Sequence, residues 1–432
     1  MVEQVSSLKT GVKYKDAPIG RIPVDWEVVE LADICDEIYR YPTYYNLNYV
    51  DQKHGVPEIR GELIKENGEL SNDLSQYRYI SRETSSKFPR TIVREGDFVI
   101  SVRGTLGKIG YVSDQLEHAN ITANLMRISP SRKRVYPLWL KQYLLSKFFQ
   151  NRLNEISAAT TIKTVKAPEL KAIKVALPLH CEQKKIAEIL ITVDEAIVKT
   201  TQIIEKTKNL KKGMMKRVLS RGIGHKKFKK TEIGEIPEEW KVVYLGDIAN
   251  IERGRFSYRP RNAPQFYGGD TPFIQTADIA NSNGRIKNYS QTLNNLGVSI
   301  SKIFPKGTIL ITIAANIGYT GILEFDGACP DSVIGIKPNE NISAIYLHYY
   351  LSGQQKKMEV IAPQCVQKNI NIQILKSWRV LLPGVEEQKQ ISNTMLAIDD
   401  EIERESEHKE QLESLKKGLM QVLLTGKLRV TV

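Results

Sequence analysis

The chain has 432 residues, of which 41% are hydrophobic, so it is too long for one ordinary core and is expected to form two or three domains. Its formal net charge of +13 favours a polyanionic partner such as nucleic acid, although a lysine-rich proteome would give a similar charge. The sequence lacks a run of 18 apolar residues, a signal-peptide stretch in residues 1–15, and zinc spacing among its four cysteines, so we expect a reduced, cytoplasmic protein without membrane partner or metal.

The sequence contains an internal repeat. The repeated segments, which we call the constant frame, lie on either side of a variable region in each half. The segment Ile19–Trp26, Ile-Gly-Arg-Ile-Pro-Val-Asp-Trp, returns as Ile-Gly-Glu-Ile-Pro-Glu-Glu-Trp at Ile233–Trp240, 214 positions later. Val175–Ser220 aligns without a gap with Val380–Thr425 at an offset of 205, so the first variable region is 9 residues longer. If the two halves had diverged from an old duplication without any functional reason, the sequence differences would not be concentrated in the middle of each half. The repeat therefore indicates one architecture that recognises two different things.

Each variable region is predicted to be a compact α+β domain. The apolar runs Phe98–Val102 and Ile309–Ile313 indicate buried strands, and glycine-rich turns follow both runs. A short aromatic helix is expected next, at Trp139–Leu145 in the first half and at Tyr346–Leu351 in the second.

A long helix is predicted to end each half, beginning near Pro178 or Pro383, because proline is tolerated in a first helical turn. Apolar residues in both segments follow the 4-3-4 spacing of a coiled-coil seam. Residues 175–220 carry a net charge of +4 and residues 380–425 one of −5, which favours pairing of the two different helices. The basic excess then lies in the variable domains, where we expect nucleic acid to bind.

The predicted fold class is α+β, with two pseudo-repeated domains separated by two long antiparallel coiled-coil helices and related by a pseudo-two-fold axis. The expected boundaries are residues 1–176 and 223–381 for the two variable domains, and residues 177–222 and 382–432 for the two helical spacers. About 40 helical residues would span roughly 60 Å. A split DNA target with an unread gap is the natural ligand of such a molecule.

Two repeated motifs give the chain a resemblance to a known family, the specificity subunits of type I restriction–modification enzymes. Ile-Gly-x-Ile-Pro-x-x-Trp occurs twice, and Leu-Pro-x-x-x-Glu-Gln-Lys occurs at Leu177–Lys184 and again at Leu382–Lys389. The resemblance extends from about Tyr14 to Leu428. It implies two target recognition domains, each reading one half of a split, asymmetric DNA target, and two conserved helical regions.

The same resemblance implies a set of partners. A specificity subunit directs methyltransferase subunits, expected in two copies, and restriction subunits to double-stranded DNA. Those partners would methylate adenine at N6 with S-adenosylmethionine and would use ATP and magnesium for cleavage. We expect no cofactor, metal or catalytic residue on this chain itself.

The sequence shows no enzymatic motif. It lacks the Asp/Asn-Pro-Pro-aromatic tetrad and the Phe-x-Gly-x-Gly loop of an amino-methyltransferase. Arg103–Lys108 lacks the full spacing of a phosphate-binding loop, and Pro330-Asp331 lies too close to Lys337 for a nuclease motif, so it is interpreted as strand and turn. Two alternatives stay open: a stand-alone DNA-binding regulator that dimerises through its helices, and an enzyme with an unrecognised site.

Three loops in each variable domain are candidates for contact with DNA. The segment Arg253–Arg261 contains four arginines and two aromatic residues, whereas the matching Tyr39–Asn46 is aromatic and nearly uncharged. Arginine can bridge O6 and N7 of guanine, and it also binds phosphate. The second pair of loops is Arg103–Lys108 and Ala314–Tyr319.

The third pair contains Lys163 and Lys368, which align and are interpreted as phosphate anchors. A charged loop is often only a solvated face, so the loops are hypotheses about DNA contact. The candidate DNA-binding residues are Arg40, Tyr44, Tyr45, Arg103, Thr105, Lys108, Lys163, Arg253, Arg255, Tyr258, Arg259, Arg261, Asn316, Gln367 and Lys368.

Overall fold

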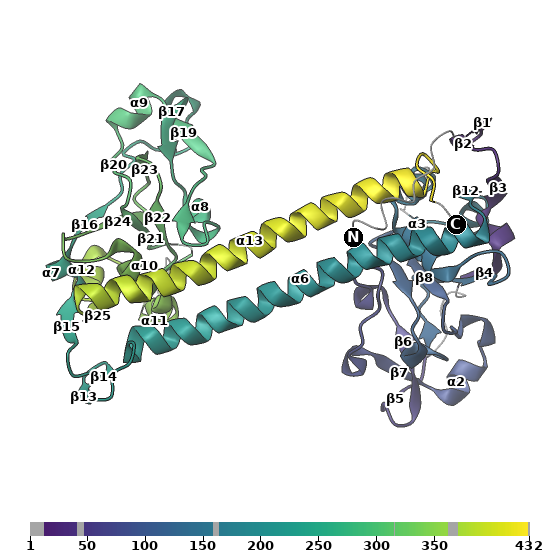
Figure 1. Ribbon diagram of the computed structural model, residues 1–432, viewed down its shortest axis with the longest axis horizontal. Helices are drawn as coiled ribbons and strands as arrows, with labels where there is room; N and C mark the ends of the chain where they lie inside the picture. Colours follow the sequence, from purple (N-terminus) through teal and green to yellow (C-terminus); the bar gives the residue numbers. More distant parts are fainter. Residues whose placement is uncertain (1–12, 41–46, 159–163, 315, 362–369, 431–432) are drawn as a thin grey trace. The chain divides into compact units, whose positions relative to one another are not determined.

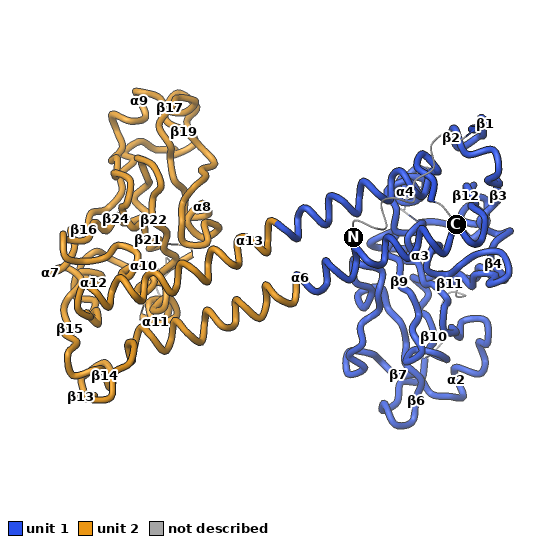
Figure 2. Tube along the Cα trace, viewed as in Figure 1, with its two compact units in different colours: residues 1–200, 408–432 blue, residues 201–407 orange. Residues whose placement is uncertain are grey.

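The computed structural model describes residues 13–40, 47–158, 164–314, 316–361 and 370–430. The chain divides into two compact units, residues 1–200 with 408–432, and residues 201–407 (Figure 2). Each unit therefore combines one variable region with part of both long helices. The predicted boundaries at the helix ends do not coincide with this division, because packing joins each part of a helix to the domain beside it.

The first unit contains a four-stranded sheet of order β4-β11-β8-β9 and a second sheet of order β10-β6-β7-β5 (Figure 1). The ribbons β1-β2 and β12-β3 carry the repeated frame. The strands are β1 (Tyr14–Ala17), β2 (Gly20–Pro23), β3 (Glu27–Glu30), β4 (Cys35–Arg40), β5 (Tyr49–Val50), β6 (Gly55–Ile59), β7 (Arg78–Ser81), β8 (Phe98–Ser101), β9 (Ile109–Tyr111), β10 (Asn120–Ile121), β11 (Leu125–Pro130) and β12 (Lys174–Leu177).

Helices of this half share a hydrophobic core with the sheet that contains Phe98 and Ile100. The α-helices are α2 (Arg82–Ser86), α3 (Pro137–Leu145), α4 (Lys147–Ala158), α5 (Ala167–Lys171) and α6 (His180–Arg221). The short 3-10 helices are η1 (Leu31–Ile34), η2 (Gly61–Leu63), η3 (Leu74–Gln76), η4 (Pro89–Thr91) and η5 (Asp114–Leu116).

The second unit repeats this plan with a five-stranded sheet of order β16-β24-β21-β22-β18 and a second sheet of order β19-β17-β23-β20. Its ribbons are β13-β14 and β15-β25. The strands are β13 (Phe228–Thr231), β14 (Gly234–Pro237), β15 (Lys241–Tyr244), β16 (Ala249–Arg253), β17 (Tyr267–Phe273), β18 (Arg285–Ile286), β19 (Gln291–Leu293), β20 (Ile303–Phe304), β21 (Ile309–Thr312), β22 (Thr320–Leu323), β23 (Gly327–Ala328), β24 (Val333–Pro338) and β25 (Arg379–Leu382). Its helices are α7 (Leu245–Ile248), η6 (Pro264–Phe266), α8 (Thr276–Ala280), α9 (Asn295–Ser299), α10 (Ala344–Gly353), α11 (Gln355–Ile361), α12 (Ile372–Lys376) and α13 (Val385–Leu423).

The predicted buried strands are confirmed, and both faces of each are covered. In β8, Phe98 and Ile100 belong to the core shared with α3 and α6, whereas Val99 faces the core of the second sheet. In β21, Ile309 and Ile311 face one core and Leu310 the other. Because successive side chains of a strand point to opposite faces, a strand covered on both sides reads as a continuous apolar run.

The repeated glutamate and glutamine at the start of each long helix bind the repeated frame. The Trp26 indole donates to Glu182 at 2.8 Å in the first unit, and Trp240 donates to Glu387 at 2.8 Å in the second. The neighbouring Gln183 accepts from the Tyr136 backbone N–H at 2.7 Å and donates to a carbonyl near its own helix start. The Leu-Pro-x-x-x-Glu-Gln-Lys motif is therefore a structural joint between helix and domain.

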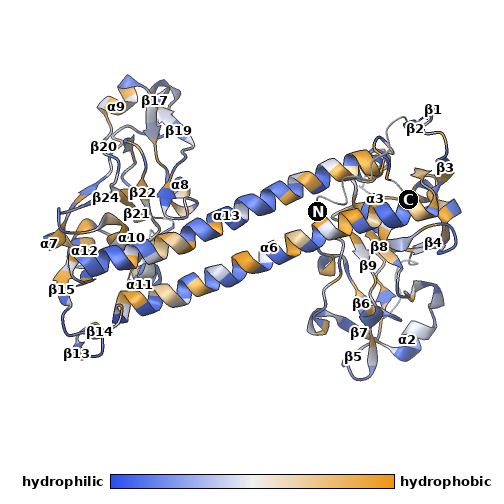
Figure 3. Ribbon diagram, in the orientation of Figure 1, coloured by the Kyte–Doolittle hydropathy of each residue, from blue (hydrophilic) through white to orange (hydrophobic). Residues whose placement is uncertain are grey.

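The two long helices run antiparallel within each unit. In the first unit, Asp194 of α6 pairs with Lys416 of α13 at 2.6 Å, and Glu182 near the start of α6 pairs with Arg429 beyond the end of α13. In the second unit, Lys211 pairs with Asp399 at 2.5 Å. The Lys211–Asp399 pair has the signs that the net charges of the helices predict, whereas Asp194 and Glu182 are acidic residues on the basic helix. The middle of α13 is strongly polar (Figure 3).

Candidate nucleic-acid interface

The candidate loops of the first unit meet at one end of its central sheet. Strands β4 and β8 both pair antiparallel with β11, and Met126 of β11 lies opposite both Arg40 and Ile100. Arg40 is the last residue of β4, and Arg103 follows β8 by two positions. The Val102 carbonyl also accepts hydrogen bonds from the Val165 N–H and the Thr164 hydroxyl, which brings the third loop to the same end. Tyr44, Tyr45 and Lys163 lie outside the described residues.

Two arginines of this end lie close enough to influence each other. Burial, followed by the positive charge of Arg103, lowers the pKa of Arg40. The Nε and Nη2 atoms of Arg40 are buried and have no hydrogen-bond partner among the residues that the structure describes. These two atoms form one edge of the guanidinium, the fork that grips a carboxylate, a phosphate or the edge of guanine. This edge of Arg40 is therefore suited to a bidentate acceptor.

The second loop is a tight turn braced by a hydroxyl group. The Ser101 hydroxyl donates to the Thr105 carbonyl at 2.6 Å and accepts from the Lys108 N–H at 2.9 Å. Gly107 adopts a φ of 79°, which the turn requires and which only glycine accepts readily. The Thr105 side chain is exposed and Lys108 is half-buried. The loop thus presents side chains from a fixed backbone.

The equivalent loop of the second unit has the same brace from a different hydroxyl. Thr312 donates to the Asn316 carbonyl and accepts from the Tyr319 N–H at 3.1 Å. The Asn316 side chain is exposed. Sequence reasoning selected the loops but missed Ser101 and Thr312; the signal was a hydroxyl residue at the end of each apolar strand.

The arginine-rich loop of the second unit starts at the equivalent end of its sheet. Arg253 lies opposite Ile334 of β24, as Arg40 lies opposite Met126 of β11. The segment containing Gln367 and Lys368 lies outside the described residues, but Ile370 just beyond it donates to the Ile313 carbonyl at 3.0 Å.

One carboxylate, Asp331, organises these arginines. Arg259 Nη2 lies 2.9 Å from Asp331 Oδ2, and Arg261 pairs with Asp331 Oδ1. Arg253 Nε donates to the Asp331 backbone carbonyl at 2.6 Å. Arg255 instead donates to the Ser301 carbonyl at 3.2 Å. Asp331 did appear in the sequence as part of a Pro-Asp pair, but its role as a counter-ion depends on contacts between residues 70 to 78 positions apart.

The two aromatic residues of this loop have different environments. Phe256 is 2% exposed and packs in a small aromatic core with Phe266 and Phe273. Tyr258 is 41% exposed, with its ring 4.7 Å from that of Phe266. Phe256 therefore anchors the loop, while Tyr258 remains a candidate for contact with DNA.

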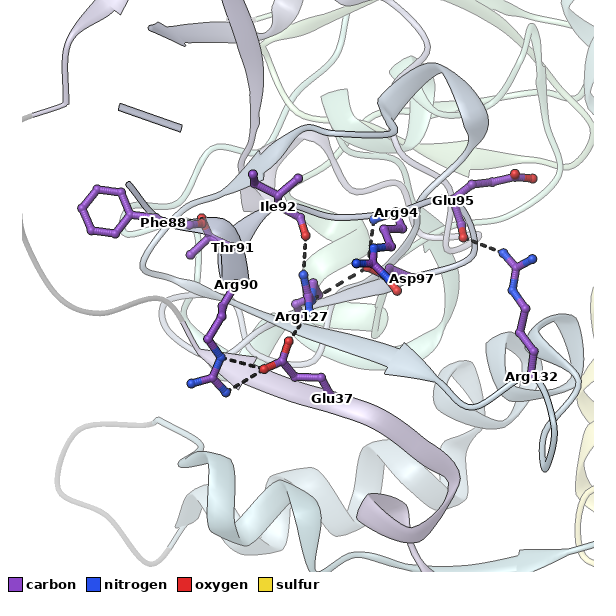
Figure 4. A network of polar contacts seen from close by, with 10 residues as sticks. All are labelled: Glu37, Phe88, Arg90, Thr91, Ile92, Arg94, Glu95, Asp97, Arg127 and Arg132. Atoms are coloured by element: carbon purple, nitrogen blue, oxygen red, sulfur yellow. Dashed lines mark hydrogen bonds and ion pairs between the residues drawn. The ribbon is translucent and has the colours of Figure 1, made fainter. Parts of the chain in front are cut away.

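A polar network that sequence reasoning missed supports the strand carrying Arg40. Arg127 of β11 pairs with Glu37 of β4 and donates to the Ile92 carbonyl (Figure 4). Arg90 donates to Glu37 at 2.7 Å, and its guanidinium lies 3.9 Å from the centroid of the Tyr39 ring. Arg127 is only 8% exposed, so it holds the sheet together and is not available to DNA, whereas the Arg90 side chain is 59% exposed.

Within the described part of the chain, no group of three or more His, Cys, Asp or Glu side chains is arranged to hold a metal ion. A search of the same residues also finds no helix that is both long and apolar enough to cross a membrane.

Comparison with known proteins identifies this arrangement. The sequence model of the family described as "Type I restriction modification DNA specificity domain" matches residues 23–209 and 237–414. The chain is 34% identical over 425 residues to the MjaX type I restriction enzyme specificity subunit of Methanocaldococcus jannaschii, covering 96% of this chain and 97% of that protein. It is 29% identical to the MjaVIII specificity subunit of the same organism, covering 96% of each chain.

Solved structures agree with the fold. A chain from a study of complex assembly and conformational transition of the type I R-M system aligns with a TM-score of 0.59 at 18% identity, covering 94% of this chain and 99% of that chain. The S subunit of a type I restriction-modification system from M. genitalium aligns with a TM-score of 0.54 at 14% identity, covering 96% and 97%. With two matched specificity domains and relatives that span its whole length, the chain belongs to the type I restriction–modification specificity subunits, the non-catalytic components that recognise DNA sequence.

Proposed function

We propose that this specificity subunit reads a split, asymmetric double-stranded DNA target, one half-site with each unit, and directs methyltransferase and restriction subunits to it. The observation that carries the proposal is the equivalence of the two sheet ends. Each bears an arginine opposite the central strand and a hydroxyl-braced loop, yet the surrounding residues differ. Two units with the same frame but different loops are suited to two different half-sites. Contacts with bases determine which sequence is recognised, whereas contacts with phosphates determine how the protein is positioned on the DNA.

The repeated Leu-Lys-Lys-Gly sequence supports two equivalent contacts with a partner. Its first lysine, Lys211 or Lys416, is used inside the protein to pair with the opposite helix. Its leucine remains exposed in both copies, 58% for Leu210 and 43% for Leu415. Because the fold does not use these leucines, we assign both surfaces to copies of one partner, the methyltransferase subunit. We place the complex in the cytoplasm, with S-adenosylmethionine, ATP and magnesium on the partners and no cofactor on this chain.

The test is methylation of a randomised duplex library by the purified chain, its candidate methyltransferase subunit and S-adenosylmethionine, with each protein also assayed alone. We expect adenine methylation only with both proteins, and only at sites with two defined halves and an undefined gap. A single continuous target, or methyl transfer by this chain alone, would contradict the proposal. Tight sequence-specific binding without any partner would favour the alternative, a stand-alone regulator.

A further inference from the structure

Asp331 lies at the centre of the arginine-rich loop of the second unit. Both of its carboxylate oxygens are engaged, one by Arg259 and one by Arg261, and its backbone carbonyl accepts from Arg253. Its side chain is nonetheless 34% exposed. The group that orders the arginines therefore faces solvent at the candidate interface.

Backbone contacts fix the position of Asp331 relative to the loop. The Gly254 N–H donates to the Val333 carbonyl at 2.9 Å, and the Arg255 N–H donates to the Cys329 carbonyl at 3.0 Å. A Cβ added to Gly254 would lie 2.3 Å from the Pro330 carbonyl oxygen, so any larger residue would force the segments apart. Isolated surface ion pairs contribute little because their side chains are loose, but here both partners extend from segments that are bonded together.

The arginines bound to Asp331 differ in the use of their remaining donors. Arg259 directs Nη1 to the carbonyls of Phe256 and Tyr258, at 2.7 and 2.9 Å, so both terminal nitrogens are used within the loop. Arg261 directs only Nη2 to Asp331 among the described residues. The two side chains are similarly exposed, 51% for Arg259 and 44% for Arg261, so the use of their donors distinguishes them. Arg259 therefore acts as a brace, and Arg261 is better placed to meet a ligand.

A carboxylate in this position is unfavourable for a phosphate clamp, because its charge repels the DNA backbone. It is favourable for reading a base, since a guanidinium held in one orientation gives directional hydrogen bonds. In the major groove a G·C pair offers the O6 and N7 acceptors of guanine beside the N4 donor of cytosine. Arg261 and Asp331 present a donor beside an acceptor, which complements that edge.

We propose that Asp331 is a specificity-determining residue of the second unit, which holds Arg261 to read the major-groove edge of a G·C pair and keeps phosphate away from the same place. This inference rests on the proposed reading of DNA by both units. It also gives Arg259 a supporting part in a loop where the sequence alone does not distinguish the arginines.

The experiment compares Asp331→Asn, Arg261→Ala and their combination in the complex with the methyltransferase subunit. Affinity is measured at two salt concentrations for a panel of duplexes, each with one base pair of the target substituted. We expect Asp331→Asn to lose about tenfold discrimination at one or two G·C positions of one half-site, while binding to unrelated duplexes holds or increases. Arg261→Ala should lose discrimination at the same positions, and the combination should lose no more. Asp326→Asn, an exposed carboxylate of the same unit, is the control and should change neither quantity.

Uniform weakening on all duplexes by Asp331→Asn, or unchanged discrimination, would overturn the proposal. If that variant does not fold, as judged by thermal unfolding, Arg261→Lys decides, because it keeps the charge and removes the fork; retained discrimination then overturns the proposal. The other half-site is the internal reference. If the Asp331→Asn complex still discriminates at both half-sites, this inference alone fails. If the wild-type complex shows no preference at any position, the proposed function fails as well.

Discussion

The buried polar residues of this protein are of two kinds. Some have all their charge and hydrogen-bonding groups paired within the constant frame, and others have groups that are not paired with any described residue. Glu182 is 1% exposed and is bound by Trp26 and Arg429, so its charge is fully used. Arg40 and His348 are different, because Nε and Nη2 of Arg40 and Nδ1 of His348 are buried and find no hydrogen-bond partner in the described part of the chain. An unpaired buried donor or acceptor costs about 1–3 kcal/mol, so such residues call for a functional or structural reason.

For Arg40 we expect that reason to be DNA. Arg40→Lys keeps a positive charge but removes the fork formed by Nε and Nη2, so we predict about tenfold weaker binding to the cognate half-site. Binding to unrelated duplexes should change much less, since phosphate attraction depends mainly on charge. Fluorescence anisotropy of the partner-bound complex measures both. Arg152→Lys, on an exposed helix position of the same unit, provides the control. Equal losses on all duplexes would show that Arg40 only attracts phosphate.

For His348 we expect a pH-dependent stability. Burial, with a smaller effect from Lys211, lowers the pKa of this histidine from 6.5 to about 3. The unfolded chain then binds a proton that the folded chain refuses, so stability is lost as pH falls from 6.5 toward 3, by up to about 1.4 kcal/mol per pH unit. His348→Leu should remove this loss. Urea unfolding of the wild type, this variant and the exposed-site control His54→Gln at pH 7 and pH 5 tests it. Parallel changes in all three proteins would exclude His348 as the source.

Each long helix contains a glycine whose presence is not explained by the stability of the helix. Gly213 lies inside α6 and Gly418 inside α13, both exposed. A Cβ added at either position would meet nothing within 4 Å. Glycine within a helix costs about 1 kcal/mol relative to alanine. The fold therefore has no need of either glycine, although both repeats retain one beside an exposed leucine.

We predict that Gly213→Ala and Gly418→Ala each stabilise the isolated protein by about 1 kcal/mol, because alanine restricts the unfolded chain and favours the helix. The bulkier Gly213→Leu and Gly418→Leu should each weaken binding of one methyltransferase subunit, measured as a change in stoichiometry by analytical ultracentrifugation. His408→Leu, at an exposed position of α13 ten residues before Gly418, serves as the control. Full binding of two partner subunits by both leucine variants would place the docking surface elsewhere.

For the whole molecule, the first unit is completed by the far end of the chain. Residues 408–432 belong to it, and Arg429 pairs with Asp25 at 2.8 Å and with Glu182 at 2.5 Å. In the second unit, the segment after α6 has the same relation to its frame, since His225 lies 2.9 Å from Glu387. The frame of each unit is thus completed by the residues that follow the long helix of the other repeat, α13 for the first unit and α6 for the second.

We predict that Arg429→Met destabilises the first unit by about 3 kcal/mol, because it leaves the buried Glu182 carboxylate without its cation. Arg152→Met removes an exposed pair and should cost no more than about 0.5 kcal/mol. Differential scanning calorimetry of both variants, with the two units melting as separate or overlapping transitions, measures the difference. Equal small shifts would mean that the Arg429 network contributes little.

The repeat, the α+β class, the buried strands and the two long helices could all be predicted from the sequence, because periodic apolar patterns and repeated motifs are local signals that need no structure. It also selected loops that share one end of each sheet. Three features could be found only in the fold: Asp331 organises the arginines, Arg429 completes the first frame, and packing divides each helix between two units. Those results depend on ion pairs between residues up to 404 positions apart, and charged contacts at such separations follow no period that a sequence reveals.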